Sequence, residues 1–87
     1  MFLHVVKVKY LDQYKLLLTF NNDTVKVVDL QNELDGAVFE PLQELDLFQQ
    51  AYVNEETQTI EWHNGADFAP EFLYEIGHEP TTAKAFA

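Results

Sequence analysis

The most distinctive segment of this chain is WHNGADFAPEFLY, which spans residues 62–74 of the 87. Its Asn64-Gly65 pair predicts a tight turn, because glycine adopts positive φ without steric cost. Asp67 stands where its carboxylate can cap a following helix, and Trp62 is suited to fill the core. We favour this structural interpretation, since folding requirements explain every residue type. The alternative is a binding loop, in which His63 and Asp67 present a donor and an acceptor beside the indole.

A C-terminal helix is predicted after this turn. Its apolar residues recur at i, i+3, i+4 and i+7, which places them on one helical face: Ala69, Phe72, Leu73 and Ile76. Pro70 suits the first turn of this helix and Gly77 can end it. The periodicity is lost after Gly77. We therefore expect residues 1–77 to form one domain and residues 78–87 a flexible tail.

The first third of the chain predicts an antiparallel β-meander. Branched and aromatic residues alternate with polar ones in two segments, which is typical of half-buried strands. Their predicted inward residues are Val6, Val8 and Tyr10, then Leu16, Leu18 and Phe20. The turn signal at residues 21–23 is followed by a third strand over residues 24–28.

The middle of the chain predicts shorter elements. Asp29 can cap a short helix that carries Leu30 and Leu34 and stops at Gly36. Residues 38–48 fit a 3₁₀ stretch as well as an α-helix, and residues 51–62 predict a second hairpin. The expected fold class is α+β: an antiparallel β-meander plus a second hairpin, packed with one or two short helices and a C-terminal helix.

Charge is distributed unevenly along the chain. Residues 1–28 hold four lysines against two aspartates, a net charge of +2, whereas residues 29–87 hold one lysine against thirteen carboxylates, a net charge of -12. Lys7 and Lys9 on the first strand are open to two interpretations, contact with phosphate or solvation of an edge strand. The net charge of -10 repels phosphate, and the chain has no arginine for bidentate recognition, so we expect no direct nucleic-acid binding.

Composition narrows the chemistry further. The chain has no cysteine and no serine, and its three glycines are isolated, so thiol and serine nucleophiles and a glycine-rich phosphate loop are excluded. The carboxylates and imidazole closest together in sequence, Glu61, His63, Asp67 and Glu71, match no established metal-site spacing. We therefore expect no catalytic, cofactor-binding or metal-binding residues. Paired carboxylates leave an unrecognised enzyme as an open alternative.

Location is inferred by default. Lys7 and Lys9 interrupt the apolar N-terminal residues, so a signal peptide is not predicted. No apolar run approaches the roughly 20 residues of a membrane span. Together with the absence of cysteine, this favours a cytoplasmic protein without membrane association.

The segment at residues 62–74 also carries a family resemblance. Trp62-x-Asn64-Gly65-Ala66-Asp67, followed by Ala69-Pro70 and Leu73-Tyr74, resembles the small bacterial family known as domain of unknown function 2442. Weaker matches extend the resemblance over nearly the whole chain to about Ile76: Val8-x-Tyr10, Leu18-x-Phe20, Val28-Asp29-Leu30 and Phe39-x-Pro41-Leu42. His63 stands where that family commonly has proline.

The resemblance implies a compact α+β fold and little chemistry. Some members of that family are fused to a helix-turn-helix segment, for which this sequence leaves no room. Others are encoded beside a second small protein, in arrangements like those of toxin and antitoxin pairs. The resemblance therefore favours a paired partner over direct DNA binding.

The function predicted from the sequence is a non-enzymatic protein-interaction module with a basic protein as its partner. The finer form of this prediction is the acidic member of a toxin–antitoxin-like pair. Predicted partner-binding residues are Glu55, Glu56, Glu71 and Glu75, with Tyr74 as an aromatic anchor. The spacing of Glu71 and Glu75 is also typical of a solvated helix face. A sensory or dimerising domain for a separate DNA-binding chain is the alternative, and it predicts homodimers formed through a strand edge.

Overall fold

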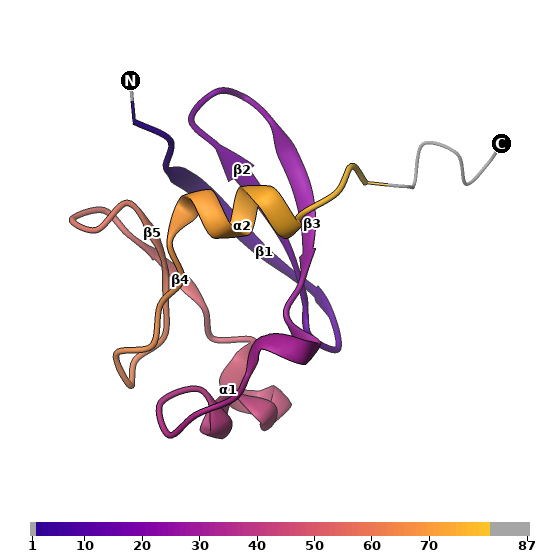
Figure 1. The fold of residues 1–87 in the computed structure, drawn as a ribbon, viewed down its shortest axis with the longest axis vertical. Coiled ribbons are helices and arrows are strands. Elements are labelled where there is room, and N and C mark those ends of the chain that lie inside the picture. Colours follow the sequence, from indigo (N-terminus) through magenta and orange to yellow (C-terminus); the bar gives the residue numbers. More distant parts are fainter. Residues whose placement is uncertain (1, 81–87) are drawn as a thin grey trace, which may run out of the picture.

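The computed structural model describes residues 2–80. Its fold is α+β, as predicted, with a three-stranded antiparallel sheet in the order β1-β2-β3 and a separate β4–β5 hairpin (Figure 1). In chain order the elements are β1 (Val5–Asp12), β2 (Lys15–Phe20), β3 (Val25–Asp29), the 3₁₀ turns η1 (Gln31–Glu33) and η2 (Glu40–Gln43), α1 (Leu45–Phe48), β4 (Tyr52–Asn54), β5 (Thr59–Glu61) and α2 (Pro70–Ile76).

The meander follows the alternation of its sequence. Leu16, Leu18 and Phe20 of β2 are fully buried on one face of the sheet. On β1, Tyr10 pairs with Leu16 and Val8 with Leu18, so both lie on the same face. The predicted strands and their tight connections are therefore confirmed, because period-2 burial is a local property of an extended chain.

The start of β1 departs from the prediction. The pairing of β1 with β2 is irregular between Val5 and Lys7, and it is Val5, 1% exposed, that enters the core. Val6 is 44% exposed, so its prediction as an inward residue was wrong. A bulge inserts one extra residue into a strand, and this reverses the faces of the residues before it.

The segment after β3 is more extended than predicted. Asp29 still pairs with Lys15 as the last residue of β3, so it does not begin an α-helix. Its carboxylate instead accepts a hydrogen bond from the Gln31 backbone amide at 3.0 Å, and only the single turn η1 follows. Leu30 and Leu34 on either side of this turn are buried. Because Asp29 is part of the strand pairing, it is not available as the N-cap of a helix.

The start of α2 also corrects a prediction. Its N-cap is Ala69, without a side-chain cap, and Asp67 lies instead in an isolated bridge with Glu61. The turn places Asp67 next to β5, so its carboxylate does not cap the helix.

The end of α2 is at Gly77, as predicted. A Cβ atom at Gly77 would meet the Leu73 carbonyl oxygen and the Lys26 Cβ, each at 3.0 Å. Since its φ is -74°, this glycine is required for close packing against β3 and not for a left-handed conformation.

The ordered chain continues past the predicted domain boundary. The His78 backbone exchanges two hydrogen bonds with Val27, of 2.8 and 3.0 Å, on the outer edge of β3. His78, which was predicted to begin a flexible tail, therefore pairs with the sheet. The pairing cannot extend to a Pro80 amide, because proline has no N–H. The rest of the predicted tail, residues 81–87, lies outside the described residues.

One core joins the two parts of the molecule. α2 lies across the sheet, and α1 lies at the far end of the long axis, below the hairpins in Figure 1. Fully buried residues form a continuous cluster from the inner face of the sheet to the hairpin and helices: Val5, Leu16, Leu18, Phe20, Val28, Leu30, Phe48, Ile60, Trp62 and Leu73. No helix within residues 2–80 is long and apolar enough to cross a membrane.

Candidate functional site

The segment from Trp62 to Ala66 forms the predicted turn. The Trp62 amide donates to the Ala66 carbonyl, and the Gly65 amide donates to the Trp62 carbonyl, each at 2.9 Å. Gly65 has a φ of 92°, the left-handed region in which glycine is favoured. The Asn64 side-chain oxygen accepts from the Ala66 amide at 3.1 Å, which closes the turn from inside. The residue types of Asn64 and Gly65 are thus explained by local geometry.

Trp62 is a core residue with one polar contact. Its ring lies against Phe48 and Phe68, with centroid distances of 5.6 and 6.1 Å. The indole N–H donates to the Phe48 carbonyl at 2.8 Å, so the buried donor is satisfied. The Asn64 side-chain amide donates to the Val38 carbonyl at 2.9 Å. The turn therefore fastens β5 to the end of α1 and to the loop before η2, which supports its structural interpretation.

His63 and Asp67, the donor and acceptor of the predicted loop, are both exposed. The His63 ring stacks on Tyr52, with a centroid distance of 4.9 Å and an interplanar angle of 26°. Within residues 2–80, neither side chain hydrogen-bonds to the other, and the Asp67 carboxylate has no hydrogen bond or ion pair. The arrangement predicted for a binding loop, a donor and an acceptor beside an open indole, is not what the turn presents.

A shallow apolar pocket lies beside the turn. It has a volume of about 130 Å³, and we call it the motif pocket. Its lining is formed by Pro41, Leu42, Leu47, Trp62, His63 and Asn64 together with Gln50. Leu47 is 43% exposed. Sequence analysis missed this pocket, because residues 38–48 show no clear period from which an outward apolar face could be predicted.

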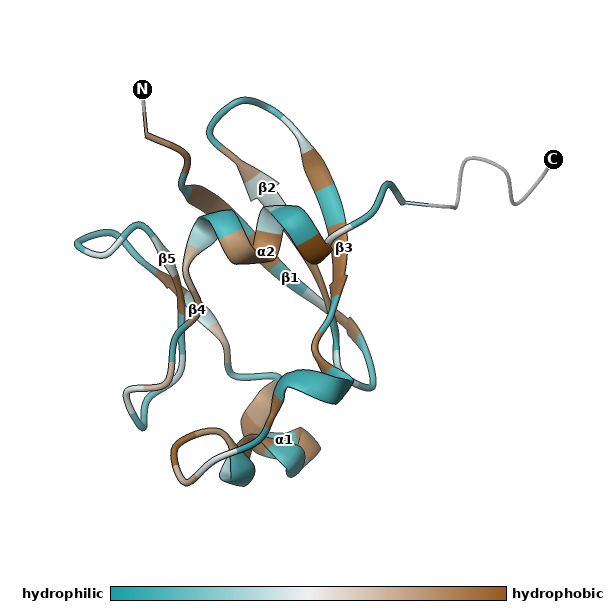
Figure 2. Cartoon of the chain, in the orientation of Figure 1, coloured by the Kyte–Doolittle hydropathy of each residue, from teal (hydrophilic) through white to brown (hydrophobic). Residues whose placement is uncertain are grey.

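Three carboxylates flank the pocket residues in sequence. Glu40 precedes Pro41, and Glu44 and Asp46 precede Leu47; all three are exposed. Figure 2 shows how hydrophobic and hydrophilic segments alternate over η2 and α1. The motif pocket is thus an apolar depression whose lining residues Pro41 and Leu47 are each preceded by an exposed carboxylate in the sequence.

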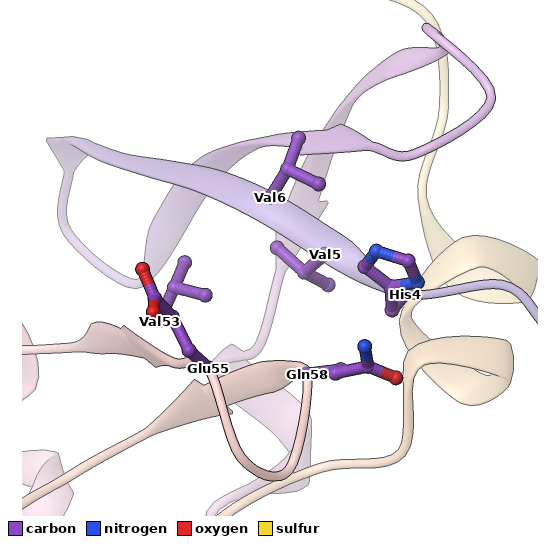
Figure 3. A pocket seen from close by; sticks show the side chains of 6 residues that line it. All are labelled: His4, Val5, Val6, Val53, Glu55 and Gln58. Atoms are coloured by element: carbon purple, nitrogen blue, oxygen red, sulfur yellow. The ribbon is translucent and has the colours of Figure 1, made fainter.

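A second pocket separates the start of β1 from the β4–β5 hairpin. It has a volume of about 270 Å³ and is lined by His4, Val5, Val6, Val53, Glu55 and Gln58 (Figure 3). The Val5 amide donates to the Gln58 carbonyl at 3.0 Å across its base. His4 and Glu55, the two titratable residues of the lining, lie at opposite ends of this pocket in Figure 3. The geometry does not join them into an acid–base pair.

The predicted partner-binding residues do not form one cluster. Glu55 and Glu56 are exposed in the β4–β5 turn, whereas Glu71 and Glu75 are exposed on α2. The two groups lie on different elements, and α1 with the motif pocket is at a third position (Figure 1). A single partner that covers all three positions would need an extended surface.

Tyr74 is occupied within the fold. Its ring meets Phe20 edge to face, with a centroid distance of 5.0 Å, and the Lys26 ammonium lies 3.8 Å from the ring centroid. The Tyr74 hydroxyl is hydrogen-bonded to the side chains of Thr24 and Asn22, and these bonds lower the pKa of Tyr74. This residue holds α2 against the β2–β3 turn, which leaves it poorly placed to anchor a partner.

The acidic charge of the second part is not neutralised internally. Of the thirteen carboxylates at residues 29–79, all but Glu33 and Glu61 are exposed. Within residues 2–80, the one ion pair joins Lys15 and Asp12 at 3.9 Å, in the meander. Glu61 accepts hydrogen bonds from Tyr52 and Asn54, and partial burial beside its negative charge raises the pKa of Tyr52.

Metal ligands do not converge within the described part of the chain. In residues 2–80, no three His, Cys, Asp or Glu side chains are placed so that they could hold a metal ion together. The four residues considered from the sequence, Glu61, His63, Asp67 and Glu71, therefore do not form such a group.

Comparison with known proteins confirms the family. A sequence profile of the family described as "Protein of unknown function (DUF2442)" matches residues 5–79, from the start of β1 to just beyond the His78 bridge. No curated protein and no solved structure matches the chain. The profile covers most of the chain and includes every element of the fold. The chain therefore belongs to the DUF2442 family.

Proposed function

We propose that this chain is a non-enzymatic protein-interaction module whose acidic part binds a basic partner protein. The observation that carries the proposal is the unneutralised charge of residues 29–79. Their exposed carboxylates form no ion pair within the described residues, and three of them lie close in sequence to residues that line an apolar pocket. Like charges held on one fold repel one another, and a cationic partner relieves that repulsion.

Charge complementarity would act mainly on encounter and choice of partner. A patch of one sign raises association rates by steering the opposite charge, and its effect falls as salt shortens the screening length to about 8 Å at physiological ionic strength. Since residues 1–28 carry a net charge of +2, a basic partner approaches the second part of the molecule preferentially.

The motif pocket supplies what charge alone lacks, an apolar anchor site. Its volume of about 130 Å³ suits a single aliphatic or small aromatic side chain. Buried apolar anchors surrounded by a polar rim account for most of the affinity of protein interfaces. The partner segment therefore combines lysine or arginine residues with at least one apolar side chain.

Tryptophan fluorescence tests this proposal directly, because Trp62 is the only tryptophan in the chain and lines the pocket. The probe is a 14-residue amphipathic peptide of leucine and lysine, titrated into the full chain at low and at high salt. We expect saturable quenching or a spectral shift that weakens at least 10-fold at 1 M NaCl. A flat titration, or binding independent of salt, would contradict the proposal.

Two double variants with the same change of charge locate the contact. Glu40→Gln/Asp46→Asn removes two carboxylates beside the motif pocket, and Glu71→Gln/Glu75→Gln removes two from α2. We expect the first double variant to lower the affinity for the lysine peptide about 3–10-fold and the second to lower it less than 2-fold. The reverse order would move the contact to α2, where the sequence had predicted it.

The toxin–antitoxin pairing is the finer form of the same proposal. In it, the partner is a basic small protein encoded next to this chain. Co-expression of the two and co-purification at low and then high salt tests it, with loss of the partner at high salt as the expected result. Co-purification that resists 1 M NaCl, or a neighbouring product that does not bind at all, would contradict it.

The alternative of a dimerising domain has less support. Backbone pairing with His78 covers the centre of the β3 edge, and the β1 edge carries exposed Lys7 and Lys9. Lysines on an edge strand oppose edge-to-edge pairing of identical chains. Sedimentation of the purified chain over a range of concentrations separates the two proposals, since the interaction module is expected to remain monomeric without its partner.

A further inference from the structure

The outer face of the three-stranded sheet is apolar at its centre. In register, Leu17 of β2 pairs with Val27 of β3, and Thr19 pairs with Val25, so these side chains point away from the core residues Leu16 and Leu18. Leu17, Val25 and Val27 are half-buried and do not pack against the core cluster. An antiparallel sheet that ends in solvent ordinarily carries polar residues on its second face.

This face is also hollowed. A depression of about 600 Å³ is lined by Leu11, Leu17, Val25, Val27, His78 and Pro80 together with the charged pair Asp12 and Lys15. Leu11 at the end of β1 is 38% exposed. α2 lies on the opposite, inner face of the sheet, where Leu73 joins the core (Figure 1). The outer face is therefore a separate surface from the motif pocket.

The charges around the outer face are unequal on its two sides. Lys15 is balanced, since it forms an ion pair with Asp12 at 3.9 Å and pairs in register with Asp29. Lys7 and Lys9 on β1 point to the outer face, and neither forms an ion pair within residues 2–80. The unbalanced charge of the face is thus positive and follows β1.

The size of the face limits what can occupy it. Three strands spaced about 4.8 Å apart and about five residues long give a surface of about 14 by 17 Å, or roughly 240 Å². A stable protein dimer buries about 800 Å² per partner, whereas one helix is about 10 Å wide. The face therefore fits one segment of chain and is too small to hold a second copy of the domain by itself.

We propose that the outer face of the β1–β3 sheet is a docking site for an acidic amphipathic segment of another protein. The apolar side chains of that segment lie over Leu17, Val25 and Val27, and its carboxylates lie beside Lys7 and Lys9. This site is opposite in charge to the acidic part proposed to bind a basic partner. The domain then has two faces for two chemically distinct partners.

Nuclear magnetic resonance of the ¹⁵N-labelled full chain tests the proposal. The probe is a 14-residue amphipathic peptide of leucine and glutamate, and the matched control is its leucine and lysine counterpart. We expect the glutamate peptide to shift the amide resonances of Leu17, Val25 and Val27 and to leave the Trp62 indole resonance in place. The lysine peptide is not expected to shift the resonances of the outer face.

Substitutions assign the contact. Leu17→Thr/Val27→Thr places β-branched, strand-favouring threonine at both positions of an exposed face, so the fold is preserved. We expect it to weaken binding of the glutamate peptide at least 10-fold. Lys7→Gln/Lys9→Gln is expected to lower the affinity for the glutamate peptide about 3–10-fold and to remove most of the salt dependence of its binding. Glu55→Gln/Glu56→Gln, on the β4–β5 turn, is the control with no expected effect.

Several outcomes would overturn this proposal and leave the proposed function standing, because that function is tested separately, by the fluorescence of Trp62 with the lysine peptide. One is the absence of shifts with the glutamate peptide, and another is equal shifts with both peptides. Concentration-dependent shifts at Leu17 and Val27 without peptide would identify a second copy as the occupant.

Discussion

The β1–β3 meander and the segment from η1 to α2 build one core by different means. In the meander, alternation along each strand sends every second aliphatic side chain inward, and the ladder of strand pairing satisfies the backbone. The segment from η1 to α2 has only short elements, so more of its backbone carbonyls need other donors. Side chains supply them: Trp62 donates to Phe48, Asn64 to Val38, and Gln43 to Leu34.

The comparison shows where single residues matter most. In an alternating strand, several residues specify the same buried face and the same register, so no single residue is decisive. The irregular segment depends on particular side chains that fill space and satisfy a carbonyl at the same time. The two regions also differ in charge. Within residues 2–80, Lys7 and Lys9 on the outer face of the meander form no ion pair, and neither do the carboxylates of residues 29–79.

The largest expected effect comes from breaking the irregular region at Trp62. Replacement Trp62→Ala removes a fully buried ring and leaves the Phe48 carbonyl without its donor, so we expect a loss of about 3–5 kcal/mol in the free energy of unfolding. Urea denaturation followed by far-ultraviolet circular dichroism measures it. Leu17→Ala in the meander is the control. Its expected loss in the free energy of unfolding is about 1 kcal/mol or less, because Leu17 lies outside the core. Equal losses for the two variants would remove the distinction between the regions.

Gly77 tests the contact at which the two regions meet. The Cβ atom of Gly77→Ala would lie 3.0 Å from Lys26 Cβ on β3, so α2 must shift, and we expect a loss of about 1–3 kcal/mol. Gly65→Ala has open space around its Cβ and acts only through its φ of 92°, at a cost of about 1 kcal/mol. Thermal and urea unfolding of both variants measure the difference. A Gly77→Ala variant as stable as the parent would show that α2 adjusts freely against β3.

Neutralising single charges sharpens the electrostatic half of the comparison. Glu75→Gln removes a repelled anion from the last turn of α2, where negative charge is also unfavourable to the helix dipole. We expect it to stabilise the fold by about 0.3–0.5 kcal/mol, whereas Lys9→Gln destabilises it by a similar amount. Both differences should vanish at 1 M NaCl in denaturation experiments. Effects of the same sign for the two variants would contradict an unbalanced charge distribution.

The smallest expected effect is on tyrosine ionisation. Partial burial and the neighbouring Glu61 raise the pKa of Tyr52, while hydrogen bonds from Thr24 and Asn22 lower the pKa of Tyr74. The stabilisation from Tyr52 is therefore full below pH 10 and is lost as pH rises through its folded pKa. That from Tyr74 exists only at alkaline pH and is lost as pH falls. In an ultraviolet pH titration, we expect Tyr74 to ionise at a lower pH than Tyr52. Tyr74→Phe and Tyr52→Phe variants assign each transition to its residue.

The Glu61→Gln variant provides the control for this titration. It removes the negative charge beside Tyr52, so it should lower the pKa of that phenol and leave Tyr74 unchanged. An unchanged order of ionisation with an unshifted Tyr52 would show that burial alone sets its pKa.

The fold could be predicted where local patterns control it, and the candidate site could not. Alternation located Leu16, Leu18 and Phe20, and Asn64-Gly65 located the turn after β5, because both signals act within a few residues. The motif pocket joins Trp62 to Pro41 and Leu47, which come from a stretch without periodicity. Their meeting depends on how α1 packs, so no local pattern could reveal it.

The sequence by itself determined the α+β class, the strands, the last helix, the family and the division of charge. The family rests on the motif at residues 62–74, and the others depend on composition or on short-range periodicity. Only the tertiary structure decided that Val6 faces solvent, that Asp67 caps nothing, that Tyr74 is occupied and that His78 extends the sheet. These outcomes are set by strand pairing and side-chain packing between residues far apart in the chain. Such long-range contacts override the local conformational preference of each residue.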